Sequence, residues 1–342
     1  MTAGAAVARE GRIDVLSRLE AVCAGRGLDV VAGRLSGLAE LPRHESIVAR
    51  SATHLLDLGG KRLRPMCVAL AARAGAGFDE RARQLAVAVE LVHSATLLHD
   101  DVVDLGDRRR GAAAARAIWG NAASIFAGDW LLVEALRRVR RARVDGLLDR
   151  LLAVIEEMIF AEAVQLEQRG RFLASRAAYL RVVEGKTASL FRWAMLAGGR
   201  AGGLDDRHCH ALESYGLHLG VAFQAIDDVL DLTGDARTTG KALFADLREG
   251  KVTYPLIVAL EREPSLRGVL EQIASEHGDS TPPETLSTAV LDALVRTRAT
   301  EECLGFARSR ATDAVLALEP IAHGASRAAL ETIAMTVVSR RR

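Results

Sequence analysis

The sequence predicts an all-α protein, and three observations favour this class. The 342 residues include only 7 prolines and 4% aromatic residues, while Ala, Leu, Arg and Glu are abundant. Those abundant residues lose little side-chain entropy in a helix. Apolar residues recur at spacings of three and four from about residue 13 to residue 338, as on one face of a helix. Gly or Pro clusters, rather than alternating strands, interrupt this pattern.

The interruptions are too short to be domain linkers, so we expect one domain over residues 1–342, built from ten or more helices. Pro282 and Pro283 indicate a surface loop within the last interruption. The interruptions are residues 41–43, 75–78, 106–111, 198–203, 233–240 and 276–283.

The composition excludes several classes of protein. Because 45 Lys and Arg oppose 44 Asp and Glu, the net charge of +1 argues against nucleic-acid binding by bulk charge. No run of 18 uncharged apolar residues is present, which excludes a membrane span. The four cysteines have no CxxC spacing, so we expect neither a disulfide framework nor a thiolate zinc site, and a reducing cytoplasm as the location. They are Cys23, Cys67, Cys209 and Cys303.

The first acidic cluster is the segment LLHDDVVD at residues 97–104. On a helix, Asp100 and Asp104 are one turn apart and share a face. His93 and Thr96 continue this polar stripe, and the opposite stripe is apolar. Like charges at this spacing destabilise a helix unless a cation lies over them, and a hard divalent cation suits oxygen ligands best.

The second acidic cluster, FQAIDDVLD at residues 223–231, repeats the pattern. Asp227 and Asp231 share a helix face with Gln224, and Gly216 and Gly220 on the same stripe would let another helix approach closely. A single cluster could be an ordinary solvated helix end. Two clusters amid apolar residues favour two acidic helices that face one cavity.

The acidic clusters predict Mg²⁺ and a phosphate-bearing substrate. Mg²⁺ keeps several waters and shares its coordination sphere with substrate phosphates, so it seldom occupies an all-protein cage. Lys and Arg side chains suited to phosphate oxygens lie near both clusters in the sequence. They are Lys61, Arg62, Arg64, Arg108, Arg109, Arg110, Lys186, Lys241 and Lys251. With no activated nucleophile or catalytic triad evident, ionisation of a diphosphate ester in an apolar cavity fits best.

These segments resemble the trans-prenyltransferase (polyprenyl diphosphate synthase) family, and the resemblance covers nearly the whole chain. The matching motifs occur in the family's order, which is far more specific than one DDxxD. They are GGKRLRP at residues 59–65, LLHDDVVD at 97–104, RRG at 109–111, Gly128 with Asp129, Lys186 with Thr187, FQxxDDxxD at 223–231 and GKxxxxDLREGKxTxP at 240–255.

The resemblance implies specific roles for these residues. Asp100, Asp104 and Asp227 would ligate three Mg²⁺ ions that bridge the allylic diphosphate, supported by Asp101, Asp228 and Asp231. The allylic substrate would be held by Arg109, Lys186, Thr187, Gln224, Lys241 and Lys251, with Thr187 and Gln224 also acting near the cation. Isopentenyl diphosphate would be held by Lys61, Arg64, His93 and Arg110.

The resemblance also implies the reaction and the architecture. The reaction is head-to-tail (1′-4) condensation: the allylic C–O bond breaks, the isopentenyl double bond attacks, and a proton leaves. The fold is an isoprenoid synthase-type helical bundle around a deep central cavity, usually a homodimer. One departure is that residues 112–115 after RRG are all Ala, where the family has Pro and Thr, which bears on how this loop closes over the diphosphates.

Product length is predicted from the side chains upstream of Asp100. One helical turn rises about 5.4 Å, which is comparable to one isoprene unit. Ala95 and Thr96 lie five and four residues before Asp100, with Val92 deeper, so no Phe or Tyr blocks the shaft. Short-chain members of the family commonly carry an aromatic there. We therefore expect a product longer than C20, in the range C30 to C50.

Three alternatives remain open. A short-chain farnesyl or geranylgeranyl diphosphate synthase would need another helix to close the cavity. A class I terpene cyclase uses the same ionisation, but its second metal motif mixes Asn or Asp with Ser/Thr and Glu. A noncatalytic subunit of a heteromeric synthase tends to lose an acidic motif, and here both are intact.

Overall fold

The computed structural model describes residues 46–233, 244–275 and 284–340. Several predicted features lie outside these described residues, so their predictions are not tested. They are Cys23, Lys241, the interruptions at 41–43 and 276–283 including Pro282 and Pro283, and nearly all of the interruption at 233–240.

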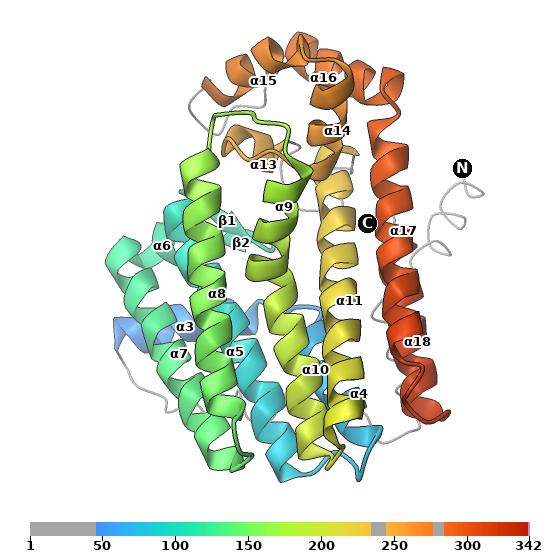
Figure 1. Cartoon of the computed structure of the whole chain (residues 1–342). Helices are drawn as coiled ribbons and strands as arrows, with labels where there is room; N and C mark the ends of the chain where they lie inside the picture. Colours follow the sequence, from blue (N-terminus) through green and yellow to red (C-terminus); the bar gives the residue numbers. More distant parts are fainter. Residues whose placement is uncertain (1–45, 234–243, 276–283, 341–342) are drawn as a thin grey trace, which may run out of the picture.

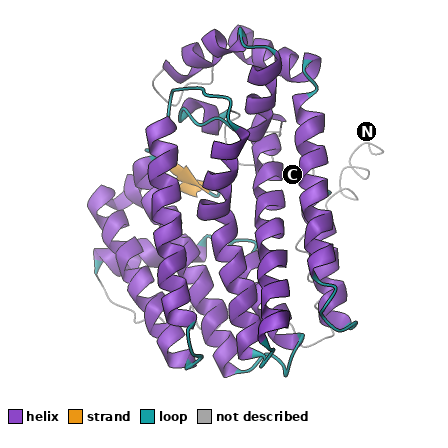
Figure 2. Cartoon of the chain, in the orientation of Figure 1, coloured by secondary structure: helices purple, strands orange, loops and turns teal. Residues whose placement is uncertain are grey.

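The described chain is helical almost throughout, which confirms the all-α prediction (Figure 2). Its first half contains α3 (Ile47–Asp57), α4 (Leu63–Arg73), α5 (Glu80–Val103), α6 (Ala115–Trp119), α7 (Asn121–Ala142) and α8 (Leu147–Gln168). The second half contains α9 (Arg176–Val183), the π-helical turn η1 (Glu184–Ala188), α10 (Ser189–Ala201), α11 (Asp206–Thr233), α13 (Ala245–Arg248), α14 (Tyr254–Arg262), α15 (Leu266–Ser275), α16 (Glu284–Arg296), α17 (Ala299–Ala317) and α18 (Ala325–Val338).

The long helices form a bundle in which α5 is central. It packs against α4, α7 and α10, while α10 packs against α11 and α11 against α17 (Figure 1). The apolar stripe predicted for α5 lies in this core, since Val87, Leu91 and Leu98 are completely buried. At one end of the bundle, α13 to α16 form a cap over the upper parts of α9 and α11 (Figure 1). No helix of the described ranges is long and apolar enough to cross a bilayer.

The turn predicted at residues 106–111 contains a small β-hairpin. Strands β1 (Arg108–Arg109) and β2 (Ala112–Ala113) pair antiparallel, with Arg108 opposite Ala113. The two residues between the strands, Arg110 and Gly111, both have positive φ, as the tight hairpin turn requires. Of the four Ala residues that depart from the family pattern, Ala112 and Ala113 therefore form one strand of a hairpin shortly after the first acidic cluster, and the other two begin α6.

Two glycines let α11 approach the helix that contains η1 and α10. A Cβ at Gly216 would lie 2.7 Å from the Phe191 carbonyl oxygen, and one at Gly220 would lie 2.5 Å from Ala188 Cα. Any larger residue at these positions would push the two backbones apart. The close approach predicted from the glycine stripe is confirmed.

Candidate active site

Both acidic clusters lie where a long helix ends. Asp104 is the C-cap of α5, and its backbone N–H donates to the Asp100 carbonyl oxygen at 2.8 Å. Asp227 and Asp231 occupy the last two turns of α11. The C-terminal end of a helix carries partial negative charge, so carboxylates there are unfavourable without cations nearby.

Asp104 has two basic partners from distant parts of the chain. Lys251 Nζ lies 2.9 Å from its carboxylate, and Arg169, directly after α8, forms a second ion pair. Lys251 also contacts Glu249. Burial acts to raise the pKa of Asp104, but Lys251 and Arg169 lower it overall. Asp104 is thereby held as a carboxylate.

Asp100 lies near the lysine of the Lys186–Thr187 motif. Burial raises the pKa of Asp100, while the positive charge of Lys186 opposes this shift and the charges of Glu162 and Asp104 add to it. The Lys186 ammonium itself forms an ion pair with Glu162 and contacts Gln165 Oε1 at 3.1 Å. Charged side chains of both signs therefore act on Asp100, with Glu162 on α8 and Lys186 in η1.

The π-helical turn η1 links the two acidic clusters. Lys186 and Thr187 lie within it, at the junction of α9 and α10, and such turns often occur at functional sites. The positive charge of Lys186 acts on Asp100, while the Thr187 hydroxyl donates to Gln224 Oε1 on α11 at 2.9 Å. Residues of both predicted clusters are therefore brought together through adjacent residues of one turn.

A buried carboxylate orients Gln224. Asp228 accepts hydrogen bonds from Gln224 Nε2 at 3.0 Å, from the Tyr179 hydroxyl at 2.7 Å and from the Tyr254 backbone N–H at 3.1 Å. Burial raises the pKa of Asp228 to about 7. Because its amide group donates to Asp228, Gln224 presents its carbonyl oxygen to Thr187. Asp228 therefore positions other site residues rather than facing the site itself.

Asp101, the aspartate directly after Asp100, also positions another side chain of the site. Asp101 is buried, and its Oδ1 accepts from Arg109 Nε at 2.8 Å. Burial raises the pKa of Asp101, and Arg109 opposes that shift. Arg109, predicted to bind the allylic substrate, is thus held on strand β1 by the neighbour of Asp100.

Asp227 contacts the far end of the described chain. Its carboxylate lies 3.2 Å from Arg340 Nη1, and the Arg340 guanidinium stacks over the Phe223 ring at 5.1 Å. Asp231 accepts a hydrogen bond from the backbone N–H of Asp246, at 3.3 Å. Lys251, five residues after Asp246, contacts Asp104. Residues 246–251 therefore contact both acidic clusters.

Three of the residues predicted to hold isopentenyl diphosphate, namely Arg64, His93 and Arg110, lie near one another. His93 is half-buried, and desolvation together with the nearby charges of Arg64 and Arg110 lowers its pKa well below the usual value. The Arg64 guanidinium stacks on the Phe191 ring at 4.4 Å. Arg110 lies against Gly60 of the GGKRLRP turn, where a Cβ would meet its guanidinium at 2.8 Å.

The predicted chain-length residues lie on α5, mostly on its buried face. Ala95 and Val92 are completely buried, and the half-buried Thr96 donates its hydroxyl to the His93 carbonyl oxygen at 2.8 Å. Nearby, a Cβ at Gly128 would lie 2.3 Å from His99 Nε2, so this glycine of α7 makes room for the His99 ring.

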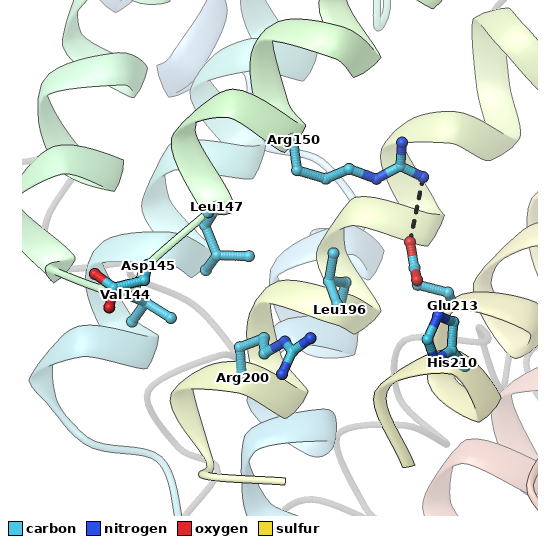
Figure 3. Close-up of a pocket in the computed structure, with 9 residues that line it drawn as sticks. Val144, Asp145, Leu147, Arg150, Leu196, Arg200, His210 and Glu213 are labelled. Carbon is cyan, nitrogen blue, oxygen red and sulfur yellow. Dashed lines mark hydrogen bonds and ion pairs between the residues drawn. The ribbon is translucent and has the colours of Figure 1, made fainter. Parts of the chain in front are cut away.

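A hollow of about 580 Å³ lies near the end of the bundle opposite the second acidic cluster (Figure 3). Its lining includes Arg150 of α8, Arg200 of α10 and Glu213 of α11, with Arg150 paired to Glu213 at 3.3 Å. Asp227 is 14 residues further along α11 than Glu213, which corresponds to about 20 Å at 1.5 Å per residue. None of the predicted site residues lines this hollow.

The donor set fits Mg²⁺ held jointly with a phosphate. Asp100, Asp104 and Asp227 offer hard oxygen ligands, the type that Mg²⁺ prefers. Across residues 46–233, 244–275 and 284–340, no three His, Cys, Asp or Glu side chains converge into a closed metal site. Mg²⁺ commonly completes its coordination with water and substrate phosphate.

Sequence reasoning missed several residues that contact the predicted ones. Arg169 and Arg340 pair with Asp104 and Asp227, Glu162 pairs with Lys186, and Tyr179 donates to Asp228. None belongs to a motif, and each lies far along the chain from its partner. The only signal was an isolated charge or hydroxyl, which does not reveal its partner.

Comparison with known proteins identifies the family. The polyprenyl synthetase family model matches residues 45–290. The chain is 34% identical to the octaprenyl diphosphate synthase of Escherichia coli over 306 residues, covering 89% of this chain and 94% of that protein. It is 34% identical to heptaprenyl diphosphate synthase component 2 of Geobacillus stearothermophilus over 293 residues, covering 86% and 90%. Geranylgeranyl diphosphate synthases are also among its relatives.

Solved structures agree with this assignment. A polyprenyl synthase from Caulobacter crescentus, crystallised with calcium and isoprenyl diphosphate, superposes with a TM-score of 0.85 at 35% identity. The superposition covers 96% of this chain and 98% of that one. The resemblance inferred from the ordered motifs is confirmed, and so is the isoprenoid synthase-type helical fold. This chain belongs to the polyprenyl synthetase family.

Proposed function

We propose that this chain catalyses the Mg²⁺-dependent head-to-tail (1′-4) condensation of isopentenyl diphosphate with an allylic diphosphate. The product is an all-trans polyprenyl diphosphate of C30 to C50. One observation carries the proposal: within η1, the charge of Lys186 acts on Asp100 and the Thr187 hydroxyl donates to Gln224, which supports one site bordered by both acidic clusters. The octaprenyl and heptaprenyl relatives support the long-chain product.

The first step is departure of the allylic diphosphate. Asp100, Asp104 and Asp227 would hold three Mg²⁺ ions, which when bound neutralise the leaving group and weaken its bond to carbon. Arg109, Lys186, Lys241 and Lys251 would hold the same diphosphate. The ion pair of Lys251 with Asp104 and the effect of the Lys186 charge on Asp100 support this role.

The second step is attack by isopentenyl diphosphate. Lys61, Arg64, His93 and Arg110 would anchor its diphosphate, and the low pKa of His93 suits a neutral imidazole that donates one N–H. The Thr187 hydroxyl and the Gln224 carbonyl oxygen, which are hydrogen-bonded to each other, would offer electron-rich atoms to the allylic cation. Proton loss to the released diphosphate completes the condensation.

We further propose that the active form is a homodimer. Large apolar side chains are exposed on α6, α7 and α8, and a second copy packed there would cover them. Heptaprenyl diphosphate synthase component 2 of Geobacillus stearothermophilus makes a different partner chain the alternative. The exposed residues are Ile118, Ile125, Phe126, Val133, Leu152, Ile159, Phe160 and Leu166.

A cytoplasmic location stays a prediction.

Product analysis tests the proposed function. Purified protein with Mg²⁺, farnesyl diphosphate and labelled isopentenyl diphosphate should give linear prenyl diphosphates of C30 to C50. Products of C15 or C20 would favour the short-chain alternative, and cyclised hydrocarbons would favour a terpene cyclase. Turnover that appears only when a partner chain is added would favour a subunit of a heteromeric synthase.

A further inference from the structure

A buried ion pair lies beside the predicted isopentenyl diphosphate pocket, between two residues that the motif-based assignment left without a role. Arg62 Nη1 donates to Glu90 Oε1, and Arg62 Nη2 donates to the Leu56 carbonyl oxygen at 3.1 Å. Only 3% of the Glu90 side chain is exposed. One guanidinium therefore joins the last turn of α3 to the middle of α5.

Arg62 also has an unusual backbone conformation. Its φ of 48° places it in the left-handed region directly before α4, where a non-glycine residue costs about 1 kcal/mol or more. Such a conformation persists only where the surroundings hold it. The two guanidinium hydrogen bonds supply that restraint. Lys61 directly precedes Arg62, and Arg64 lies in the first turn of α4.

Glu90 faces more than one of the basic groups of this pocket. It lies three residues before His93, on the same face of α5. Besides its hydrogen bond to Arg62, its charge acts on both Arg64 and Arg110. Arg62, Arg64 and Arg110 are positively charged and Glu90 is negatively charged, so these four side chains together carry 3 − 1 = +2. Such an excess of positive charge favours an anionic ligand.

We propose that the Arg62–Glu90 pair is a positioning device for the isopentenyl diphosphate pocket. It holds the turn between α3 and α4 so that Lys61 and Arg64 converge with His93 and Arg110. The inference rests on the proposed function, which assigns isopentenyl diphosphate to this pocket. It adds two positioning residues that do not themselves contact the substrate.

Substitution Arg62→Lys separates geometry from charge. Lysine keeps the positive charge of the pocket but cannot make the planar two-pronged contact with Glu90 and Leu56. We expect the KM for isopentenyl diphosphate to rise about tenfold, while the KM for the allylic substrate changes by less than about twofold. A general loss of folding would instead lower the active fraction, and with it the apparent kcat, without a selective change in either KM.

Glu90→Leu provides a second variant. It removes the oxygen that accepts from Arg62, so Arg62 loses its restraint and we again expect a selective rise in the KM for isopentenyl diphosphate. Loss of the negative charge alone would favour the anionic substrate, so a rise in this KM reports the lost position. The effects of Arg62→Lys and Glu90→Leu should be less than additive in the double variant, because both break one contact. Glu134→Leu is the matched control, since Glu134 is equally buried, pairs with Arg137 on α7 and should leave both KM values unchanged.

Calorimetric titration of isopentenyl diphosphate into the protein without an allylic substrate makes the test independent of turnover. Arg62→Lys should weaken this binding about tenfold. If the wild-type protein binds but forms no prenyl product, the proposed function fails while the pocket assignment stands. If the wild-type protein turns over and Arg62→Lys leaves the KM and the binding unchanged, or shifts both KM values together, the positioning role is wrong.

Discussion

Asp100, Asp104 and Asp227 are each close to a cation supplied by another part of the chain. Asp104 contacts Lys251, Asp227 contacts Arg340, and Asp100 lies within the field of Lys186. Carboxylates crowded at the negative ends of two helices require such compensation. The same three carboxylates are the ones that we assign to Mg²⁺.

Removing one of these carboxylates should abolish the reaction without unfolding the protein. We expect Asp100→Ala and Asp227→Ala each to lower kcat by about a thousandfold or more, because the charge of the leaving diphosphate is no longer neutralised. Asp149→Ala is the control, since Asp149 lies exposed on α8, away from the site. Steady-state kinetics that show near-normal turnover in Asp100→Ala would remove that residue from the metal role.

The raised pKa of Asp228 predicts a pH-dependent stability. The folded protein binds a proton at Asp228 up to a pKa of about 7, whereas the unfolded chain releases it near 3.8. Between these values the native state binds more protons, so the free energy of unfolding falls as the pH rises. From about pH 5 to about pH 7, the wild type should lose about 2 kcal/mol relative to Asp228→Asn. Urea unfolding of both proteins at the two pH values measures their free energies of unfolding. A difference in stability between them that is the same at both pH values would contradict the prediction.

The reactive side chains could be predicted from the sequence, but their supporting contacts could not. A carboxylate spacing of four residues implies a shared helix face whatever the tertiary structure, so Asp100 with Asp104 was evident. Arg340 lies 113 residues after Asp227 by numbering, 340 − 227 = 113, and no local pattern relates the two. The Tyr179–Asp228 contact likewise depends on how α9 packs against α11.

Among the structural elements, α11 and the α9–η1–α10 helix define the site because they approach each other closely. Gly220 lies against Ala188, the last residue of η1, directly after Thr187. The hydrogen bond from Thr187 to Gln224 spans the same contact. The separation of these two helices therefore sets the position of both side chains.

Substitution Gly220→Ala should disturb the site and the fold together. Its methyl group would lie 2.5 Å from Ala188 Cα, so the helices must separate, at a cost of about 1–3 kcal/mol in stability. The Thr187 to Gln224 hydrogen bond would lengthen, and we expect kcat to fall at least about tenfold. Thermal unfolding and steady-state kinetics measure the two effects.

Gly305→Ala is the matched control on α17, because nothing lies within 4 Å of its Cβ position. This substitution should stabilise the protein by up to about 1 kcal/mol, since Ala favours the helix over Gly. Equal behaviour of the two variants would mean that the close approach of α11 does not constrain the site.

At this scale the sequence predicted the helices better than their irregularities. The glycine stripe of α11 is periodic and so could be recognised. The π-helical turn of η1 leaves no comparable pattern, because residues 184–188 contain no helix-breaking residue other than Gly185. The hairpin of β1 and β2 was hidden for a similar reason, since a run of alanines favours a helix and not a strand.

For the whole molecule, the bundle around α5 is expected to contain the growing chain. Ala95 and Val92 are small and completely buried on α5, one and two turns before the acidic cluster. Substitution Ala95→Phe should place a ring in the path of the product and shorten it by one or more isoprene units, because one turn rises about 5.4 Å. Chromatography of the dephosphorylated products measures their length.

The control for this variant is Ala307→Phe. Ala307 is a completely buried alanine on α17, and it lies in a separate hydrophobic cluster from Ala95. This substitution should cost stability through overpacking, typically about 1–3 kcal/mol, without changing the chain length. A product of unchanged length in Ala95→Phe would show that another helix sets the limit.

The overall architecture could be predicted because seven motifs in a fixed order identify one family, and that family has one fold. Composition alone led to a helical protein but not to its helix pairing. The exposed apolar side chains of α7 and α8, such as Phe126 and Phe160, could not be distinguished from core residues by periodicity. A pattern of spacing shows which residues share a face, but not what covers that face.

The most direct test is a crystal structure of the protein with Mg²⁺ and a non-hydrolysable allylic thiolodiphosphate. We expect the diphosphate between the ends of α5 and α11, with metal density joining it to Asp100, Asp104 and Asp227. A diphosphate bound elsewhere, or metal on one acidic cluster alone, would contradict the shared site on which the proposed function depends.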